Sequence, residues 1–295
     1  MPVCRKEFIY ACFRSAGVAL PAEEQLKKEG LLLSTEKEGR ALKVLVLNLM
    51  PTKLETELQL ARLLGRTPLP VKMELLGVHR MPRHTSAVHM QRFYQSLEAV
   101  EEQYYDGLIL TGPLWNGCPL NRWSITHAGS TMHICWSAQA GRYYHYGIEK
   151  QVLSQKLSGI FSHTVCAPEN PLMAGFDDVF TAPHSRYSAV ETAGIRTIPE
   201  LEILAESGEA GVYAIWAKKR RQLFVLGHPE YDRDSLQKEY LRDLTADRGL
   251  RPPEHCFAEG DLNHPVPCTW RSGATLLFAN WLGVLAEKIY PALSC

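Results

Sequence analysis

The chain has 295 residues, enough for one large α/β domain or for two smaller ones. Apolar residues make up 45% and charged residues 22%, which is typical of a soluble globular protein and excludes a disordered chain, collagen and a coiled coil. Lysine plus arginine and aspartate plus glutamate both number 32, so the formal net charge is +0. We therefore expect no nucleic-acid partner, because a polyphosphate-binding surface needs a basic surplus.

The eight cysteines are widely spaced, and no two of them form a C-x-x-C pair. No secretory signal precedes them. The apolar stretch from Phe8 to Phe13 ends at Arg14, far short of the ~20 apolar residues that a membrane helix needs. These features predict reduced thiols in a cytoplasmic protein that does not cross a membrane.

The first 40 or so residues are mixed in pattern and rich in charge, which predicts an N-terminal arm with one helix packed on the main domain. After this segment, the pattern of apolar residues becomes clear enough to predict individual strands and helices. Residues 42–49 form an apolar, β-branched run that ends at Met50-Pro51, as expected for a buried strand of a parallel sheet.

A helix is expected directly after this strand. The polar segment 52–57 opens it, and Gly65 ends it. Its apolar positions recur every three or four residues, the spacing of a buried helix face, and they are Leu54, Leu58, Ala61 and Leu64.

The same alternation continues along the chain. Further helices are predicted at 89–102 and 138–146. Further strands are predicted at 71–76, 107–111, 131–134, 201–205, 212–216 and 222–227. The basic run 218–221 is typical of a solvated hairpin turn. Strands that alternate with helices predict an α/β fold with a mainly parallel sheet flanked by helices. Since no repeat or low-complexity linker interrupts the chain, we expect a single domain over residues 1–295.

Cys135 is the first candidate for chemistry. It follows a predicted strand and precedes a predicted helix, a turn that exposes a nucleophile and directs helix N–H groups toward it. N–H groups in that position stabilise a thiolate. The competing interpretation is a buried cysteine that only fills space.

The segment Gly227-His228-Pro229-Glu230-Tyr231 is the second candidate. It lies at the carboxyl end of a predicted strand, where α/β sheets bind their ligands. In an extended segment His228 and Glu230 share one face, so the carboxylate can orient the imidazole. With Cys135, these residues supply a nucleophile, a base and an orienting group.

Neither a metal site nor a phosphate-binding loop is predicted. The sequence has no H-x-x-x-H, H-E-x-x-H or paired C-x-x-C pattern, although it contains 11 histidines and 8 cysteines. It also lacks G-x-x-x-x-G-K and G-x-G-x-x-G.

From about Leu42 to Pro291 the sequence resembles a known family, the homoserine O-acyltransferases of methionine biosynthesis. The resemblance rests on ordered blocks rather than on one motif. These blocks are NLMP at 48–51 with Lys53, Glu55, Thr56 and Glu57, DGLILTG at 106–112, CWSAQA at 135–140, KLSG at 156–159, GFDD at 175–178, APHSRY at 182–187, GHPEY at 227–231, WRSG at 270–273 and NWL at 280–282.

The resemblance implies a three-layer fold like that of class I glutamine amidotransferases, of the flavodoxin-like kind, in one catalytic domain. It implies that Cys135 is the acyl-accepting nucleophile, that His228 is the base and that Glu230 is its partner. The N–H of Trp136 would then help to hold the oxyanion.

Three further residues match substrate-contacting positions of the family. They are Lys156, Ser185 and Arg242, with Arg242 holding the carboxylate of the amino acid. The competing interpretation of Arg242 is an exposed helix charge, but the fork of a guanidinium suits a carboxylate.

The acyl donor stays open. Residues 113–134, the 22 positions between Gly112 and Cys135, are fewer than the family usually has and leave little room for a helix. Residues 134–148 look more like the acetylating branch and 182–187 more like the succinylating one, and we favour acetyl-CoA. Trp115 would narrow the space for a succinyl tail, whereas Arg122 would supply a partner for its carboxylate.

We therefore expect transfer of an acetyl or succinyl group from acyl-CoA, a co-substrate rather than a bound cofactor, to homoserine. The alternatives are a serine O-acetyltransferase, a glutaminase-type amidotransferase and an impaired homologue that acts as a binding protein. No metal, nucleic acid or membrane partner is expected, and a homodimer is one option for the oligomeric state.

Overall fold

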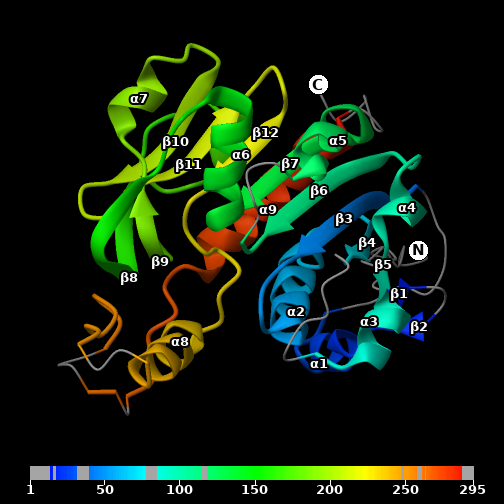
Figure 1. Ribbon diagram of the computed structural model, residues 1–295, viewed down its shortest axis with the longest axis horizontal. Helices are drawn as coiled ribbons and strands as arrows, with labels where there is room; N and C mark the ends of the chain where they lie inside the picture. Colours follow the sequence, from blue (N-terminus) through cyan, green and yellow to red (C-terminus); the bar gives the residue numbers. More distant parts are fainter. Residues whose placement is uncertain are drawn as a thin grey trace, which may run out of the picture.

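The computed structural model describes residues 14–15, 18–31, 40–77, 85–113, 118–246, 249–257, 261–262 and 264–287. Among these residues, a ten-stranded sheet runs through the molecule in the order β5-β4-β3-β6-β7-β12-β11-β10-β8-β9 (Figure 1). A short two-stranded ribbon, β1 (Arg14–Ser15) with β2 (Val18–Ala19), is separate from it.

One half of the large sheet is parallel. Every neighbouring pair in it runs in the same direction, and its strands are β5 (Tyr94–Gln95), β4 (Val71–Leu76), β3 (Leu42–Asn48), β6 (Tyr105–Thr111), β7 (Ala128–Ile134) and β12 (Gln222–Val225). The predicted α/β fold with a mainly parallel sheet is confirmed.

The other half is antiparallel. Its strands are β11 (Gly211–Ala217), β10 (Leu201–Ser207), β8 (Gln151–Val165) and β9 (Val179–Ala189). The hairpin turn at 218–221 is as predicted, with the Arg221 N–H donating to the Lys218 carbonyl at 3.2 Å. The long strands β8 and β9 have no counterpart among the predicted elements.

Helices cover both faces of the parallel half. α1 (Ala22–Lys28), α2 (Lys53–Leu64) and α9 (Arg271–Ala286) pack with Val44 and Val46 of β3 in one apolar core. α5 (Pro119–His127) and α6 (Trp136–Tyr146) pack with Leu45 and Leu47 in another. Since successive strand residues point to opposite faces, the result is three layers (Figure 1).

The remaining helices are short or lie beside this sandwich. They are α3 (Ala87–Phe93), α4 (Leu97–Val100), the 3-10 turn η1 (Pro171–Met173), α7 (Thr192–Arg196) and α8 (Ser235–Leu244). Within the described part of the chain, no helix combines the length and the apolar character needed to cross a membrane.

Helix α2 buries Ala61 and Leu64 and packs Leu58 on the core as predicted, but its first turn differs from the prediction. Leu54 is 45% exposed, whereas the charged residues Lys53 and Glu57 are buried. Lys53 donates to the Asn48 carbonyl at the end of β3, and Glu57 accepts from Tyr94 Oη at 2.6 Å. This polar network, and not the leucine spacing alone, sets the rotation of the helix.

The predicted helix over 89–102 is broken. α3 ends at Phe93, Tyr94–Gln95 pair with β4 as the edge strand β5, and α4 begins after Ser96, whose side chain accepts from the Ala99 N–H. The Tyr94 hydroxyl is tied to Glu57, which favours the extended backbone at this point.

The short crossover 113–134 does contain a helix, contrary to expectation. α5 has nine residues and begins with Pro119 in its first turn, where the missing N–H costs nothing. The predicted influence of Trp115 lies outside the described residues.

Gly107 lets α9 approach the sheet, and its substitution tests that packing. A Cβ there would lie 2.7 Å from both Leu285 Cδ1 and the Trp281 ring. We expect Gly107→Ala to lower the free energy of unfolding in urea by about 1–3 kcal/mol, the usual cost of overpacking. Gly208→Ala, which meets open space, is the control. Equal effects of the two variants would contradict close packing at Gly107.

Candidate active site

Cys135 occupies a strained turn between β7 and α6. Its backbone has φ 53° and ψ −109°, a left-handed conformation that costs a non-glycine residue about 1–3 kcal/mol. Two hydrogen bonds hold it there: the Cys135 N–H donates to the Val225 carbonyl at 2.7 Å, and the Cys135 carbonyl accepts from the Gln139 N–H at 3.2 Å. The predicted strand-turn-helix setting is confirmed.

The side chain of Cys135 is nearly enclosed. It is 8% exposed, and its Sγ donates to the Ser185 carbonyl of β9 at 3.8 Å. Trp136, the first residue of α6, borders the same pocket, and Lys150 Nζ lies 3.9 Å above its ring. The thiol therefore faces a pocket at the positive end of a helix.

His228 and Glu230 form a buried pair beyond the end of β12. Nδ1 of His228 lies 2.8 Å from Oε1 of Glu230, and the two residues are 4% and 3% exposed. The segment turns, with the Tyr231 N–H donating to the His228 carbonyl at 3.2 Å, instead of extending as predicted. The pairing of the two side chains nevertheless forms.

Both the backbone and the ring of His228 are held in place. Its backbone N–H donates to the Pro183 carbonyl at 2.8 Å, and the Tyr231 ring stacks on it with centroids 4.1 Å apart. Gly227 permits the approach to β9, because a Cβ there would lie 2.8 Å from the Pro183 oxygen.

The charge state of His228 is set by its neighbours. Burial alone would lower the pKa of the imidazole, but the charges of Cys135 and Glu230 and hydrogen bonds to both raise that pKa well above its ordinary value. Because Cys135 acts on the pKa of the imidazole, the thiol lies near His228. The three predicted catalytic residues come together as a cysteine, an imidazolium and a carboxylate.

A pocket of about 410 Å³ opens onto Cys135. The residues predicted to contact substrate all line it, although they come from different elements: Lys156 from β8, Ser185 from β9 and Arg242 from α8. Gln139, Arg186, Glu239 and Asp243 also line it and were not predicted, because nothing in their local pattern sets them apart from ordinary helix and strand residues.

Asp243 joins the two cations of the pocket. Its carboxylate lies 2.7 Å from Lys156 Nζ and 2.7 Å from Arg242 Nη2. Burial alone would raise the pKa of Asp243, but hydrogen bonds from Lys156 and Arg242 lower it below its ordinary value. Glu239 adds a second carboxylate at 3.5 Å from Lys156.

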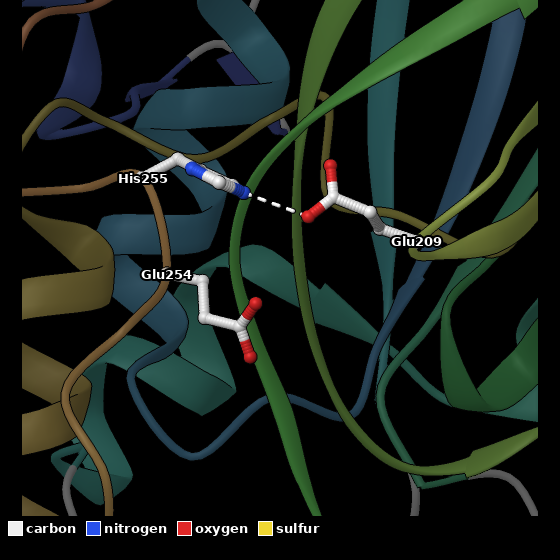
Figure 2. Close-up of side chains that lie close together, drawn as sticks. All are labelled: Glu209, Glu254 and His255. Atoms are coloured by element: carbon white, nitrogen blue, oxygen red, sulfur yellow. Dashed lines mark hydrogen bonds and ion pairs between the residues drawn. The ribbon is translucent and has the colours of Figure 1, made fainter.

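Two other groups lie apart from this pocket. Arg122, considered above as a partner for a succinyl carboxylate, is exposed on α5 and does not line the pocket. Among the described residues, Glu209, Glu254 and His255 are the group whose ligand atoms lie close enough to hold a metal. Figure 2 shows the His255 ring directed at Glu209, with Nε2 2.9 Å from its carboxylate, on an exposed surface.

Comparison with solved structures shows the fold. A putative GMP synthase component from Thermoplasma acidophilum superposes with a TM-score of 0.53 at 14% identity, covering 87% of this chain and all of that one. A glutamine amidotransferase from Thermotoga maritima superposes with a TM-score of 0.51 at 10% identity, covering 85% of this chain and 99% of that one. The class I glutamine-amidotransferase-like fold is thereby confirmed.

Comparison with known sequences shows the family. The family model for homoserine O-succinyltransferase matches residues 17–291. A homoserine O-acetyltransferase from Thermotoga neapolitana is 47% identical over 290 residues, which is 92% of this chain and 95% of that protein. A homoserine O-succinyltransferase from Shewanella baltica is 42% identical over 292 residues, 92% of this chain and 93% of that protein. The chain belongs to the homoserine O-acyltransferase family, the acetyl- and succinyltransferases of methionine biosynthesis.

Proposed function

We propose that this pocket transfers an acyl group from acyl-CoA to the hydroxyl of homoserine through an acyl-thioester on Cys135. One observation carries the proposal: Cys135 stands on a strained turn at the pocket, near a buried His228–Glu230 pair. A nucleophile, its base and an orienting carboxylate are the parts that covalent acyl transfer needs.

In the first half-reaction, the Cys135 thiolate attacks the carbonyl carbon of the acyl-CoA thioester. The tetrahedral oxyanion forms near the N-terminus of α6, where the Trp136 N–H stabilises it. The bond to the CoA sulfur breaks, and the His228 imidazolium donates its proton to the departing thiolate. Cys135 is left acylated and His228 neutral.

In the second half-reaction, neutral His228 accepts the proton of the homoserine hydroxyl as its oxygen attacks the acyl carbon. The bond to Cys135 Sγ breaks, so the thiolate and the imidazolium are both restored. Glu230 keeps the His228 ring oriented through the 2.8 Å contact at Nδ1, which leaves Nε2 to exchange the proton.

The polar residues at the rim of the pocket bind the acceptor, homoserine. Arg242 and Lys156 offer a fork and a point charge to the α-carboxylate of homoserine, while Ser185 lies beside Cys135. We place the reaction in the cytoplasm, which fits the reduced state of the five described cysteines. Homoserine is favoured over serine and glutamine, because the identified relatives are named for homoserine.

The covalent step is tested by substitution. We expect Cys135→Ala to abolish both acyl-enzyme formation and turnover, and His228→Ala to come close to that loss. Glu230→Ala should cost less, since an orienting residue contributes less than the nucleophile it serves. Intact-mass measurement after mixing with acetyl-CoA or succinyl-CoA reads the acyl-enzyme directly. Full turnover by Cys135→Ala would leave direct transfer to the hydroxyl as the mechanism.

The ion pair is tested by thiol chemistry. Because the pKa of His228 is raised in the folded protein, its charge and the stabilisation that it gives persist through neutral pH and are lost as the pH rises through that folded-state value. We expect His228→Gln to slow alkylation of Cys135 by iodoacetamide at pH 7 about tenfold or more. Peptide mass mapping measures the rate, with exposed Cys166 as an internal control. An equal response of both cysteines would contradict the ion pair.

The acceptor subsite is tested at Arg242. Lysine keeps the charge but loses the two-pronged contact with a carboxylate, so Arg242→Lys should raise KM for homoserine about tenfold. The rate of Cys135 acylation should change less than this KM. Arg233→Lys, an exposed arginine just before α8, is the matched control. A change in acylation alone would place Arg242 at the donor instead.

A further inference from the structure

One buried arginine lines the pocket, a second is close enough for their charges to interact, and neither has a carboxylate partner in the described part of the chain. Arg186 on β9 lines the pocket and is 5% exposed, and Arg142 on α6 is 0% exposed. The acids of the pocket, Glu239 and Asp243, are engaged with Lys156 and Arg242 instead. Buried charges in proteins are normally paired, so two unpaired cations need an explanation.

The hydrogen bonds of these arginines do not neutralise them. Arg186 donates to the Ser188 carbonyl at 2.6 Å, to the Ala210 carbonyl and to Nδ1 of His184 at 3.4 Å, all of them uncharged acceptors. All three nitrogens of Arg142 lack a partner among the described residues. Burial first, and then the charge of Arg186, lower the pKa of Arg142 to about 9, so it remains a cation at neutral pH.

Two further unpartnered groups belong to residues that line the pocket. Gln139 Nε2 and Ser185 Oγ are buried and have no partner among the described residues, and both residues line the pocket. Gln139 Oε1 accepts from Ser188 Oγ at 2.6 Å, which holds α6 against β9. A buried donor without a partner costs free energy, and a ligand that accepts hydrogen bonds from these groups would recover that cost.

The donors follow one face of α6 from the nucleophile inward. Cys135, Gln139 and Arg142 are spaced by four and three residues, so they lie one above another on the helix. Long helical side chains lean toward the N-terminus, which here is the Cys135 end. A group attached to Cys135 Sγ that extended along this face would run toward Gln139 and Arg142.

We propose that Arg142, Arg186, Gln139 and Ser185 form a carboxylate subsite for the far end of the acyl group, so that the enzyme accepts a succinyl-type donor. This inference rests on the proposed function, since it takes the acyl group to be carried by Cys135. A succinyl chain places its carboxylate three carbon–carbon bonds beyond the thioester carbon, whereas an acetyl group ends in a methyl and leaves the subsite unfilled. This proposal therefore favours succinyl-CoA, whereas the resemblance of residues 134–148 to the acetylating branch favours acetyl-CoA.

Donor kinetics test the subsite. Succinyl-CoA and butyryl-CoA share a four-carbon chain and differ in the terminal carboxylate, so the ratio of their kcat/KM values isolates the charge. We expect a ratio of about ten or more in the wild type, and a fall of about tenfold in Arg142→Leu. Arg196→Leu, an exposed arginine paired with Glu206, should keep the wild-type ratio. A ratio near one in the wild type, or one unchanged in Arg142→Leu, would overturn the proposal.

A binding measurement separates this inference from the proposed function. Succinate should raise the Tm of the wild type more than acetate or sodium chloride at equal ionic strength, and the difference should vanish in Arg142→Leu. Equal shifts by all three salts would show a general anion effect and overturn the subsite. If no acyl-CoA labels Cys135 while succinate still binds, the proposed function fails and the subsite stands.

We expect the variant to fold, because an apolar residue of similar volume removes the cost of burying an unpaired charge. Arg142→Met provides a second apolar replacement with a more adaptable side chain. Both variants should give the same donor ratio, and disagreement between them would attribute the effect to repacking rather than to charge.

Discussion

The hydrogen bond from the Cys135 N–H to the Val225 carbonyl is the contact on which the site depends. It joins the carboxyl ends of two neighbouring parallel strands, β7 and β12, whose register pairs Ile134 with Val225. Cys135 follows one of these strands directly, and His228 follows the other after two intervening residues. A single backbone bond therefore helps to fix the turn at Cys135 and brings the proposed base, His228, to its side.

The antiparallel half of the sheet completes the site. Three nearly consecutive residues of β9 contact it: the Pro183 carbonyl holds His228, the Ser185 carbonyl accepts from Cys135, and Arg186 lies at the pocket. β8 supplies Lys156 next to them. The parallel strands provide the reacting groups, whereas the antiparallel pair forms the opposite wall. A change in the β8–β9 register would displace base, nucleophile and pocket together.

The parts of the structure that sequence predicts well are those with local causes. The bounds of β4 and the turn at Cys135 follow from an apolar run and from what flanks it, and the His228–Glu230 pair follows from two residues in one short segment. The predictions that are wrong concern features whose causes lie outside the local sequence segment. Helix 89–102 breaks because Tyr94 bonds to Glu57, and Leu54 faces solvent because Lys53 reaches back to β3.

Other features leave no trace in a local pattern. Most of the first half of β8 is exposed or half-buried, so it lacks the alternation that announces a strand. Arg142 lies in a helix among polar and aromatic residues, where an arginine is ordinarily solvated. α6 packs against β6, β7 and β12, and the burial of Arg142 is a tertiary result that no spacing within the helix encodes.

Asp243 also determines what happens when an acceptor enters. Its carboxylate already spans Lys156 and Arg242, each at 2.7 Å, so both cations are satisfied before an acceptor binds. An amino acid bound there as proposed would displace one carboxylate by another and create no new net charge pairing. Such an exchange would have little net electrostatic driving force, and Asp243 would compete for the same cations when the product departs. In the proposed mechanism, Asp243 would thus occupy the place of the ligand between turnovers and favour release of the product over tight binding.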